Sequence, residues 1–119
     1  MMEIKDLPDD VLGILAYGTI SEEDYKKVLV PATEKKLARH KRIKMLFQLA
    51  DMDGIEPAAV WEDTKFGVQH WTEFSHIALV TDNDWIKAMT LMFSPFFPGQ
   101  IKLFGANDAE KAREWIIAV

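Results

Sequence analysis

The sequence contains no cysteine among its 119 residues. This absence excludes disulfide frameworks, thiolate zinc sites, iron–sulfur clusters and cysteine nucleophiles. No apolar run approaches the roughly 20 residues of a membrane-spanning helix. The first ten residues, MMEIKDLPDD, lack the basic and apolar segments of a secretory signal. We therefore expect a cytoplasmic protein without a transmembrane segment.

Basic residues are also in the minority, with 14 Lys and Arg against 19 Asp and Glu, which gives a net charge of -5. This balance disfavours nucleic acid as a partner, because phosphate binding requires positive charge. The one basic cluster comprises Lys35, Lys36, the run 39–42 and Lys44. It is either a solvated helix face or a contact for lipid phosphates. With 49% hydrophobic residues and no repeats or linkers, the chain should form a single domain over residues 1–119.

Apolar periodicity predicts strands in the first half of the chain. Residues 2–7 and 11–20 are separated by a turn-type cluster and predict a β-hairpin. Ser21, with Asp24 three residues later, predicts the N-cap of a helix over 22–40. Pro31 predicts a kink or a break into two short helices, since it disfavours a helical residue before it. Residues 42–50 predict a buried strand that ends in a loop at 51–54.

The second half alternates helices with strands. The patterns predict helices over 58–74 and 85–97, strands over 76–81 and 100–104, and a last amphipathic helix capped by Asn107 or Asp108. Asp82 or Asn83 is the expected cap of the helix over 85–97. The order is ββαβαβαβα. It predicts an α/β fold in which about four helices pack on a mixed five-stranded sheet.

Residues spread over nearly the whole chain carry a resemblance to a known family. They are Tyr25, Pro31, Glu34, His40-Lys-Arg-Ile43, Trp61-Glu-Asp63, Lys65-Phe-Gly67, His70-Trp71, Ile77-Ala-Leu-Val80, Asp82, Trp85-Ile86, Pro98-Gly99, Lys102-Leu-Phe104 and Ala112-Arg-Glu-Trp115. This set resembles the SpoIIAA-like family of small bacterial STAS and Sec14-like proteins. The resemblance implies a mixed sheet with packed helices, related to anti-sigma-factor antagonists and to lipid-transfer domains.

The resemblance also implies where a regulatory serine would stand. In the antagonists a phosphorylatable serine follows a buried strand at the start of a helix, but the matching segment 50–57 contains no serine or threonine. A STAS-type interaction module lacking that switch is one interpretation, with Asp51 and Asp53 as partner-binding residues. The other is that both aspartates are solvated residues at a strand end.

Catalysis and metal binding have little support. Asp51 and Asp53 also look like the first motif of haloacid-dehalogenase-type phosphatases, which makes a small phosphatase-like enzyme a remote alternative. Ile55, however, stands where threonine is expected. The three histidines are His40, His70 and His76, and none forms a His-x-x-x-His pair. We expect no enzyme activity, no catalytic residue, no metal and no cofactor.

The main functional signal is an excess of apolar residues on the helix over 85–97, which is apolar nearly all round. The excess predicts core packing between the sheet and the helix over 58–74, a homodimer or protein interface, or a pocket. The favoured interpretation is a binding protein that holds an apolar or amphipathic, lipid-like ligand between these two helices. Its candidate ligand-binding residues are Phe66, His70, Trp71, Trp85, Met89, Met92, Phe93 and Phe97.

Overall fold

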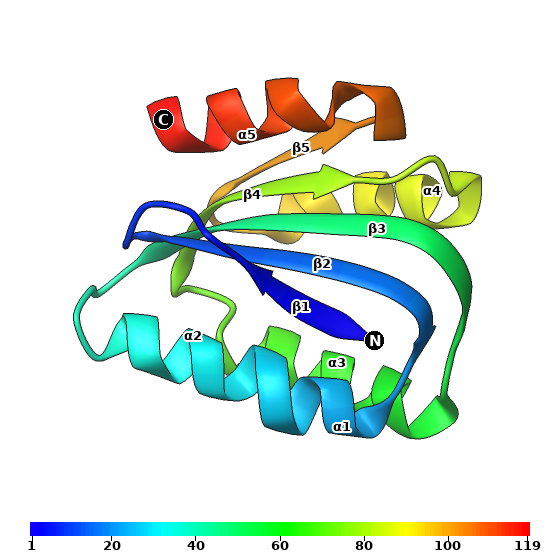
Figure 1. Cartoon of the computed structure of the whole chain (residues 1–119). Coiled ribbons are helices and arrows are strands. Elements are labelled where there is room, and N and C mark those ends of the chain that lie inside the picture. Colours follow the sequence, from blue (N-terminus) through cyan, green and yellow to red (C-terminus); the bar gives the residue numbers. More distant parts are fainter.

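Five strands form one mixed sheet in the spatial order β1-β2-β3-β4-β5 (Figure 1). β1 (Met2–Lys5) pairs antiparallel with β2 (Val11–Ile20), which confirms the predicted hairpin. β3 (Ile43–Ile55), β4 (Phe74–Val80) and β5 (Gln100–Phe104) continue the sheet in parallel. This computed structural model describes residues 1–119.

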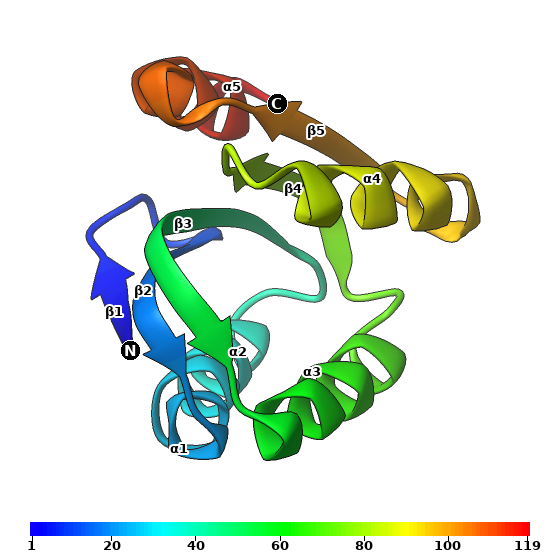
Figure 2. The same ribbon diagram turned by 90° about the vertical axis from the view of Figure 1, so that its right-hand side faces the viewer.

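The helices lie on two sides of the sheet. They are α1 (Glu22–Asp24), the π segment η1 (Tyr25–Leu29), α2 (Val30–Leu37), α3 (Pro57–Gln69), α4 (Asp84–Phe93) and α5 (Ala109–Ala118), with short 3₁₀ turns at η2 (Ser94–Phe96) and η3 (Ala106–Asp108). Right-handed crossovers between neighbouring parallel strands place α1 to α4 on one face. Figure 2 shows α5 across the sheet from α1, α2 and α3. The predicted α/β fold and element order are confirmed.

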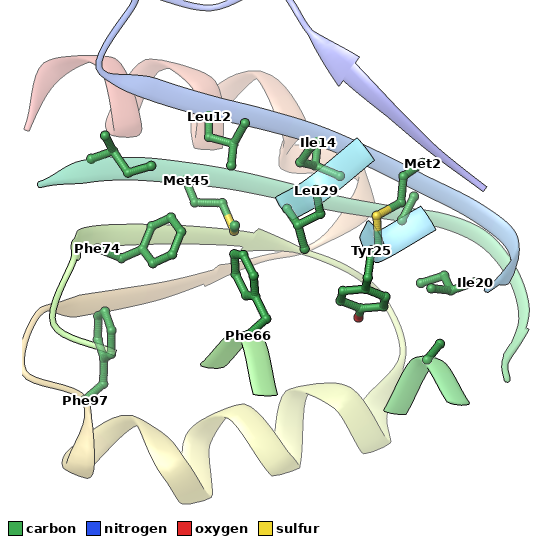
Figure 3. Packing of buried hydrophobic residues seen from close by; sticks show 13 residues of the cluster. Met2, Leu12, Ile14, Ile20, Tyr25, Leu29, Met45, Phe66, Phe74 and Phe97 are labelled. Carbon is green, nitrogen blue, oxygen red and sulfur yellow. The ribbon is translucent and has the colours of Figure 1, made fainter. Parts of the chain in front are cut away.

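Two apolar clusters occupy the two faces. The larger contains thirteen buried residues from the strands, η1, α3 and the end of η2 (Figure 3): Met2, Leu12, Ile14, Ala16, Ile20, Tyr25, Leu29, Ile43, Met45, Ala59, Phe66, Phe74 and Phe97. The smaller joins α5 to the other face through Val11, Leu46, Ala78, Val80, Ala112 and Ile116. Because side chains alternate along a strand, neighbouring residues such as Met45 and Leu46 enter different clusters.

The helical segment after β2 differs from the prediction in one respect. Ser21 and Asp24 form the predicted capping box, in which the Asp24 backbone N–H donates to Ser21 Oγ. Val30, however, is helical with φ -62° and ψ -50°, so the expected break before Pro31 is wrong. The chain instead widens into the π segment one turn earlier, where the Val30 N–H donates to the carbonyl of Tyr25. A wider turn relieves the crowding between a proline ring and the preceding carbonyl.

β3 runs farther than its apolar pattern indicates. The predicted loop at 51–54 is wrong, because Met52 pairs with Gly18 and Gly54 with Thr19, while Asp51 and Asp53 are the extra residues of bulges on β3. Asp51 has a φ of 48°, in the left-handed region, and the register shifts on β2 lie on both sides of Gly18. These irregularities bend the strand pair toward α1, as the curved ends of β2 and β3 show in Figure 1.

Two helices end earlier than the sequence predicts, and one predicted cap is confirmed. α3 ends at Gln69 rather than at residue 74, so Trp71 lies in the turn before β4. The helix predicted to reach residue 97 ends as α4 at Phe93 and continues only as the 3₁₀ turn η2. Asn83 is the predicted N-cap of α4, where its Oδ1 accepts from the Ile86 N–H at 3.0 Å. None of these helices has the length and apolar character required to span a membrane.

Candidate functional site

The inward side of α3 brings together two of the predicted ligand residues, Phe66 and His70. The ring of Phe66 lies 4.8 Å from that of His70 and 5.9 Å from that of Phe74, between centroids. His70 is 6% exposed, and neither of its ring nitrogens makes a hydrogen bond. Glu73 places Oε1 3.4 Å from His70 Nδ1. A buried polar group without a partner costs stability, so His70 is unusual for a core residue.

Asp63 shares a helix face with His70 but is engaged elsewhere. The hydroxyl of Tyr25 donates to Asp63 Oδ1 at 2.9 Å. Burial, reinforced by the nearby Asp63 charge, raises the pKa of Tyr25 well above its usual value. The phenol therefore remains a hydrogen-bond donor at neutral pH and connects η1 to α3.

A second pair of predicted ligand residues connects the end of α3 to the end of η2. Phe97 is buried, and its ring meets Trp71 edge to face at 5.5 Å and 89°. Trp71 remains partly exposed. Since edge-to-face aromatic pairs are favourable beyond their buried area, this contact fixes the chain on either side of α4.

α4 itself is loosely held. It contributes no buried residue and has no side chain in either apolar cluster. Met89 and Ile86 are half-buried, while Trp85, Met92 and Phe93 are exposed. The expectation that this helix is packed into the core between the sheet and α3 is therefore wrong. α3 and α4 also lie apart in space (Figures 1 and 2).

The sheet surface on the α3 and α4 side is incompletely covered. Six large apolar side chains on β3, β4 and β5 are only half-buried, and we call them the apolar floor: Phe47, Leu49, Ile77, Leu79, Ile101 and Leu103. Register places Phe47, Leu79 and Leu103 side by side in one row across the three strands. On the opposite face, Ala78 and Val80 of β4 are fully buried under α5. The six floor residues thus all lie on the side of α3 and α4.

The two predicted partner-binding aspartates lie away from the apolar floor residues of β4 and β5. Asp51 and Asp53 are exposed on the bent extension of β3, beyond the last β3–β4 pair at Gln48 and Val80. No group of three or more His, Asp or Glu side chains is placed to hold a metal ion.

The basic cluster is largely engaged within the protein. Asp9 accepts from Arg39 Nη2 at 2.6 Å, and its other carboxylate oxygen lies 2.7 Å from His40 Nε2. Lys36 donates to the Asp9 backbone carbonyl at 2.9 Å. Lys44 is buried, and its amine donates to the carbonyl of Val119 at 2.9 Å. These contacts join the β1–β2 turn to the end of α2, and they join β3 to Val119.

Two hollows open on α3. One, of about 220 Å³, lies between η1, α2 and α3, and its walls include Lys26, Glu62 and Lys65. The other, of about 410 Å³, follows the outward side of α3 from Trp61 to Gln69. Neither is lined by a residue of α4. Neither hollow therefore lies between α3 and α4, although Phe66, a predicted ligand residue, lines the first.

Comparison with known proteins decides the family. A sequence model of the SpoIIAA-like family matches residues 11–117. The chain belongs to the SpoIIAA-like family. A similar solved structure is that of an uncharacterised protein of the DUF3478 family with a SpoIIAA-like fold, from Shewanella loihica PV-4. It is 30% identical, with a TM-score of 0.78 over 98% of this chain and 92% of that chain. No curated protein matches the chain.

Within this SpoIIAA-like fold, the sequence prediction found the helices that flank the apolar floor but missed the floor itself. A signal for it was present, because Phe47, Leu79 and Leu103 each alternate with residues of the opposite face. Their strands read as buried runs, and buried runs indicate cover on both faces. How far α4 stands from the sheet could not be read from that pattern.

Proposed function

We propose that this protein binds an apolar or amphipathic, lipid-like molecule on the apolar floor between α3 and α4, and that it does not catalyse a reaction. One observation carries the proposal: a continuous row of large apolar side chains, Phe47, Leu79 and Leu103, is only half-buried on the sheet face that α3 and α4 flank. Removing apolar surface from water is favourable by about 25 cal/mol per Å², so an acyl chain on this floor would be stabilised.

His70 supports an amphipathic rather than a purely hydrocarbon ligand. Its imidazole, in which Nε2 has no partner, lies beside Phe66, and the floor residues Phe47 and Ile77 pack against the cluster that contains Phe66. A ligand hydroxyl or carboxylate that reached the imidazole would satisfy a nitrogen that has no partner in the protein. Met89 and Phe93 on α4 would supply adaptable apolar contacts on the other side.

A non-catalytic binding function agrees with the fold, since proteins with SpoIIAA-like and STAS folds are generally not enzymes. Asp51 and Asp53 lie exposed on a bent strand, apart from the floor residues of β4 and β5, which gives the phosphatase alternative no further support. We expect the protein to work without a cofactor.

The test is native mass spectrometry of the purified protein, followed by titration with oleic acid, a fatty acid with a single carboxylate. We expect an adduct of one oleate per chain. Leu79→Gln should weaken binding at least about tenfold, because it places an amide on the apolar floor. Trp85→Gln, on the outward side of α4, is the matched control and should bind as the wild type does. Equal binding by both variants, or no oleate adduct at all, would contradict the proposal.

A second candidate is a STAS-type interaction module, which the fold fits. The observation that favours it is the exposed, left-handed Asp51 on the extension of β3, with Asp53 two residues on. A partner captured from a lysate by the wild type and lost in Asp51→Ala and Asp53→Ala, but kept in Leu79→Gln, would favour this function over ligand binding. Self-association, also expected from the apolar excess, would use the outer helix faces rather than the floor.

A further inference from the structure

The outward side of α4 and η2 is a second apolar surface, separate from the floor. We call it the outer α4 face and define it by Trp85, Ala88, Leu91, Met92 and Phe96, all of them exposed. Trp85, Ala88 and Met92 follow the i, i+3, i+7 spacing of one helix side. Trp85 is 71% exposed, Met92 63% and Phe96 73%. Apolar side chains of this size are rarely left together in water.

The face carries one charge: Asp84 at the start of α4, one turn before Ala88, is exposed. Between residues 85 and 101 the single charged side chain is Lys87, which is half-buried and does not belong to the outer α4 face. The chain as a whole carries a net charge of -5. Two copies would therefore repel each other over most of their surface, but not over this part of it. An apolar face with a single charge at one end is the surface best suited to contact with a second copy.

The size of the face agrees with self-association. A large apolar side chain offers roughly 150–250 Å², so the exposed parts of these residues amount to about 600 Å². A stable interface buries about 800 Å² on each partner. The outer α4 face with a narrow polar rim supplies that area, and its apolar part alone reaches the upper end of the roughly 300–600 Å² found for the largest patch on monomeric proteins.

A lipid surface fits the same face less well. Helices that lie in a membrane interface carry lysine and arginine along their polar side. α4 has one lysine, Lys87, and begins with Asp84 directly after Asp82 and Asn83. Acidic residues at the start of α4, in a chain with a net charge of -5, oppose its approach to anionic lipids.

We propose that two copies of this chain pair through the outer α4 face about a two-fold axis near Ala88. The small side chain of Ala88 allows the two helices to approach within the usual distance of about 8–10 Å. In an antiparallel pair centred there, Trp85 of one copy meets Met92 of the other, and the same contact repeats across the axis. The apolar floor lies on the other side of α4, so this pairing is independent of ligand binding.

The first experiment is sedimentation velocity over a wide concentration range. The wild type should shift from the mass of one chain, 13.6 kDa, to that of two as concentration rises. Met92→Glu should remain at the mass of one chain, because it sets a charge against an apolar surface at both contacts. Val68→Glu is the matched control, since Val68 is an exposed apolar residue on the outward side of α3. It should dimerise as the wild type does.

A charge-pair experiment tests the register. Trp85→Glu and Met92→Lys should each remain monomeric alone. A mixture of the two should form a dimer, because the carboxylate introduced in one copy would face the amine introduced in the other. The side chains replaced in these variants are exposed, and circular dichroism should confirm that each variant is folded.

Three results would overturn the proposal. One is a wild type that stays monomeric at every concentration, and another is a Met92→Glu variant that still dimerises. The third is a monomer that sediments with phosphatidylglycerol vesicles and loses this binding in Met92→Glu, which would assign the face to a membrane instead.

Discussion

The hydroxyl of Tyr25 donates to Asp63 Oδ1 at 2.9 Å, and this bond joins η1 to the middle of α3 across 38 positions of sequence. Tyr25 is 2% exposed, whereas the similar bond from Tyr17 to Glu3, at 3.1 Å, lies in solvent. The two tyrosine–carboxylate pairs therefore differ mainly in burial. They provide a direct comparison of one interaction in two environments.

Tyr25→Phe should lower the free energy of unfolding by about 1–2 kcal/mol, because a hydrogen bond to a charged group is lost from a buried position. Tyr17→Phe should change it by less than about 0.5 kcal/mol, since water replaces the hydroxyl there. Urea unfolding of both variants measures the difference. Equal losses would show that burial of Tyr25 does not strengthen its bond.

Two glycines should respond in opposite directions to alanine. A Cβ at Gly67, within α3, meets no atom within 4 Å, whereas a Cβ at Gly99 would lie 2.3 Å from the backbone oxygen of Ser75. Gly67→Ala should stabilise the protein by about 0.5–1 kcal/mol, because alanine is the better helix former. Gly99→Ala should destabilise it by roughly 1–3 kcal/mol, because β5 must move away from β4. Thermal unfolding measures both. A Gly99→Ala variant as stable as the wild type would show that the close contact between Gly99 and Ser75 is not required.

His76 should titrate below its usual range. Partial burial and the positive charges of Lys44 and Arg42 lower the pKa of His76 from 6.5. Because the folded state binds this proton less tightly than the unfolded state, the stability that His76 contributes is present above pH 6.5. It is lost as pH falls through the lowered pKa.

An NMR titration of the His76 ring protons measures that value directly. Lys44→Met should raise the pKa of His76 toward 6.5, because it removes one of the two nearby cations. A pKa of His76 that is unchanged in Lys44→Met would contradict the charge contribution.

The left-handed Asp51 should prefer glycine. At a φ of 48° a residue with a Cβ is strained, and aspartate tolerates this conformation better than most. Asp51→Gly should be neutral or stabilising, and Asp51→Val should lower the free energy of unfolding by about 1–2 kcal/mol. Asp53 has ordinary extended backbone and exposed placement, so Asp53→Val is the control and should cost less. Urea unfolding of the three variants tests the order.

Local chemistry was sufficient to predict most of the fold from the sequence. Ser21 with Asp24 and Asn83 mark helix starts through side-chain hydrogen bonds to nearby backbone, and the alternating strand 100–104 forms an exposed edge as expected. The strand end at 51–54 was missed because its pairing with Gly18 and Thr19 depends on bulges that leave Asp51 and Asp53 without a partner on β2. Pairing between distant segments leaves no local signal in a short polar run.

The candidate site, like the fold, could be predicted from the sequence only in part. Composition and periodicity by themselves determined that the helix after Asn83 carries more apolar surface than one contact can bury, because hydrophobicity belongs to the residues. Only the tertiary structure decided which side chains of this helix face the sheet and which face solvent. The distance of α4 from the sheet leaves Leu79 half-covered and turns Trp85 toward solvent, and that distance depends on packing between strands and helices far apart in the chain.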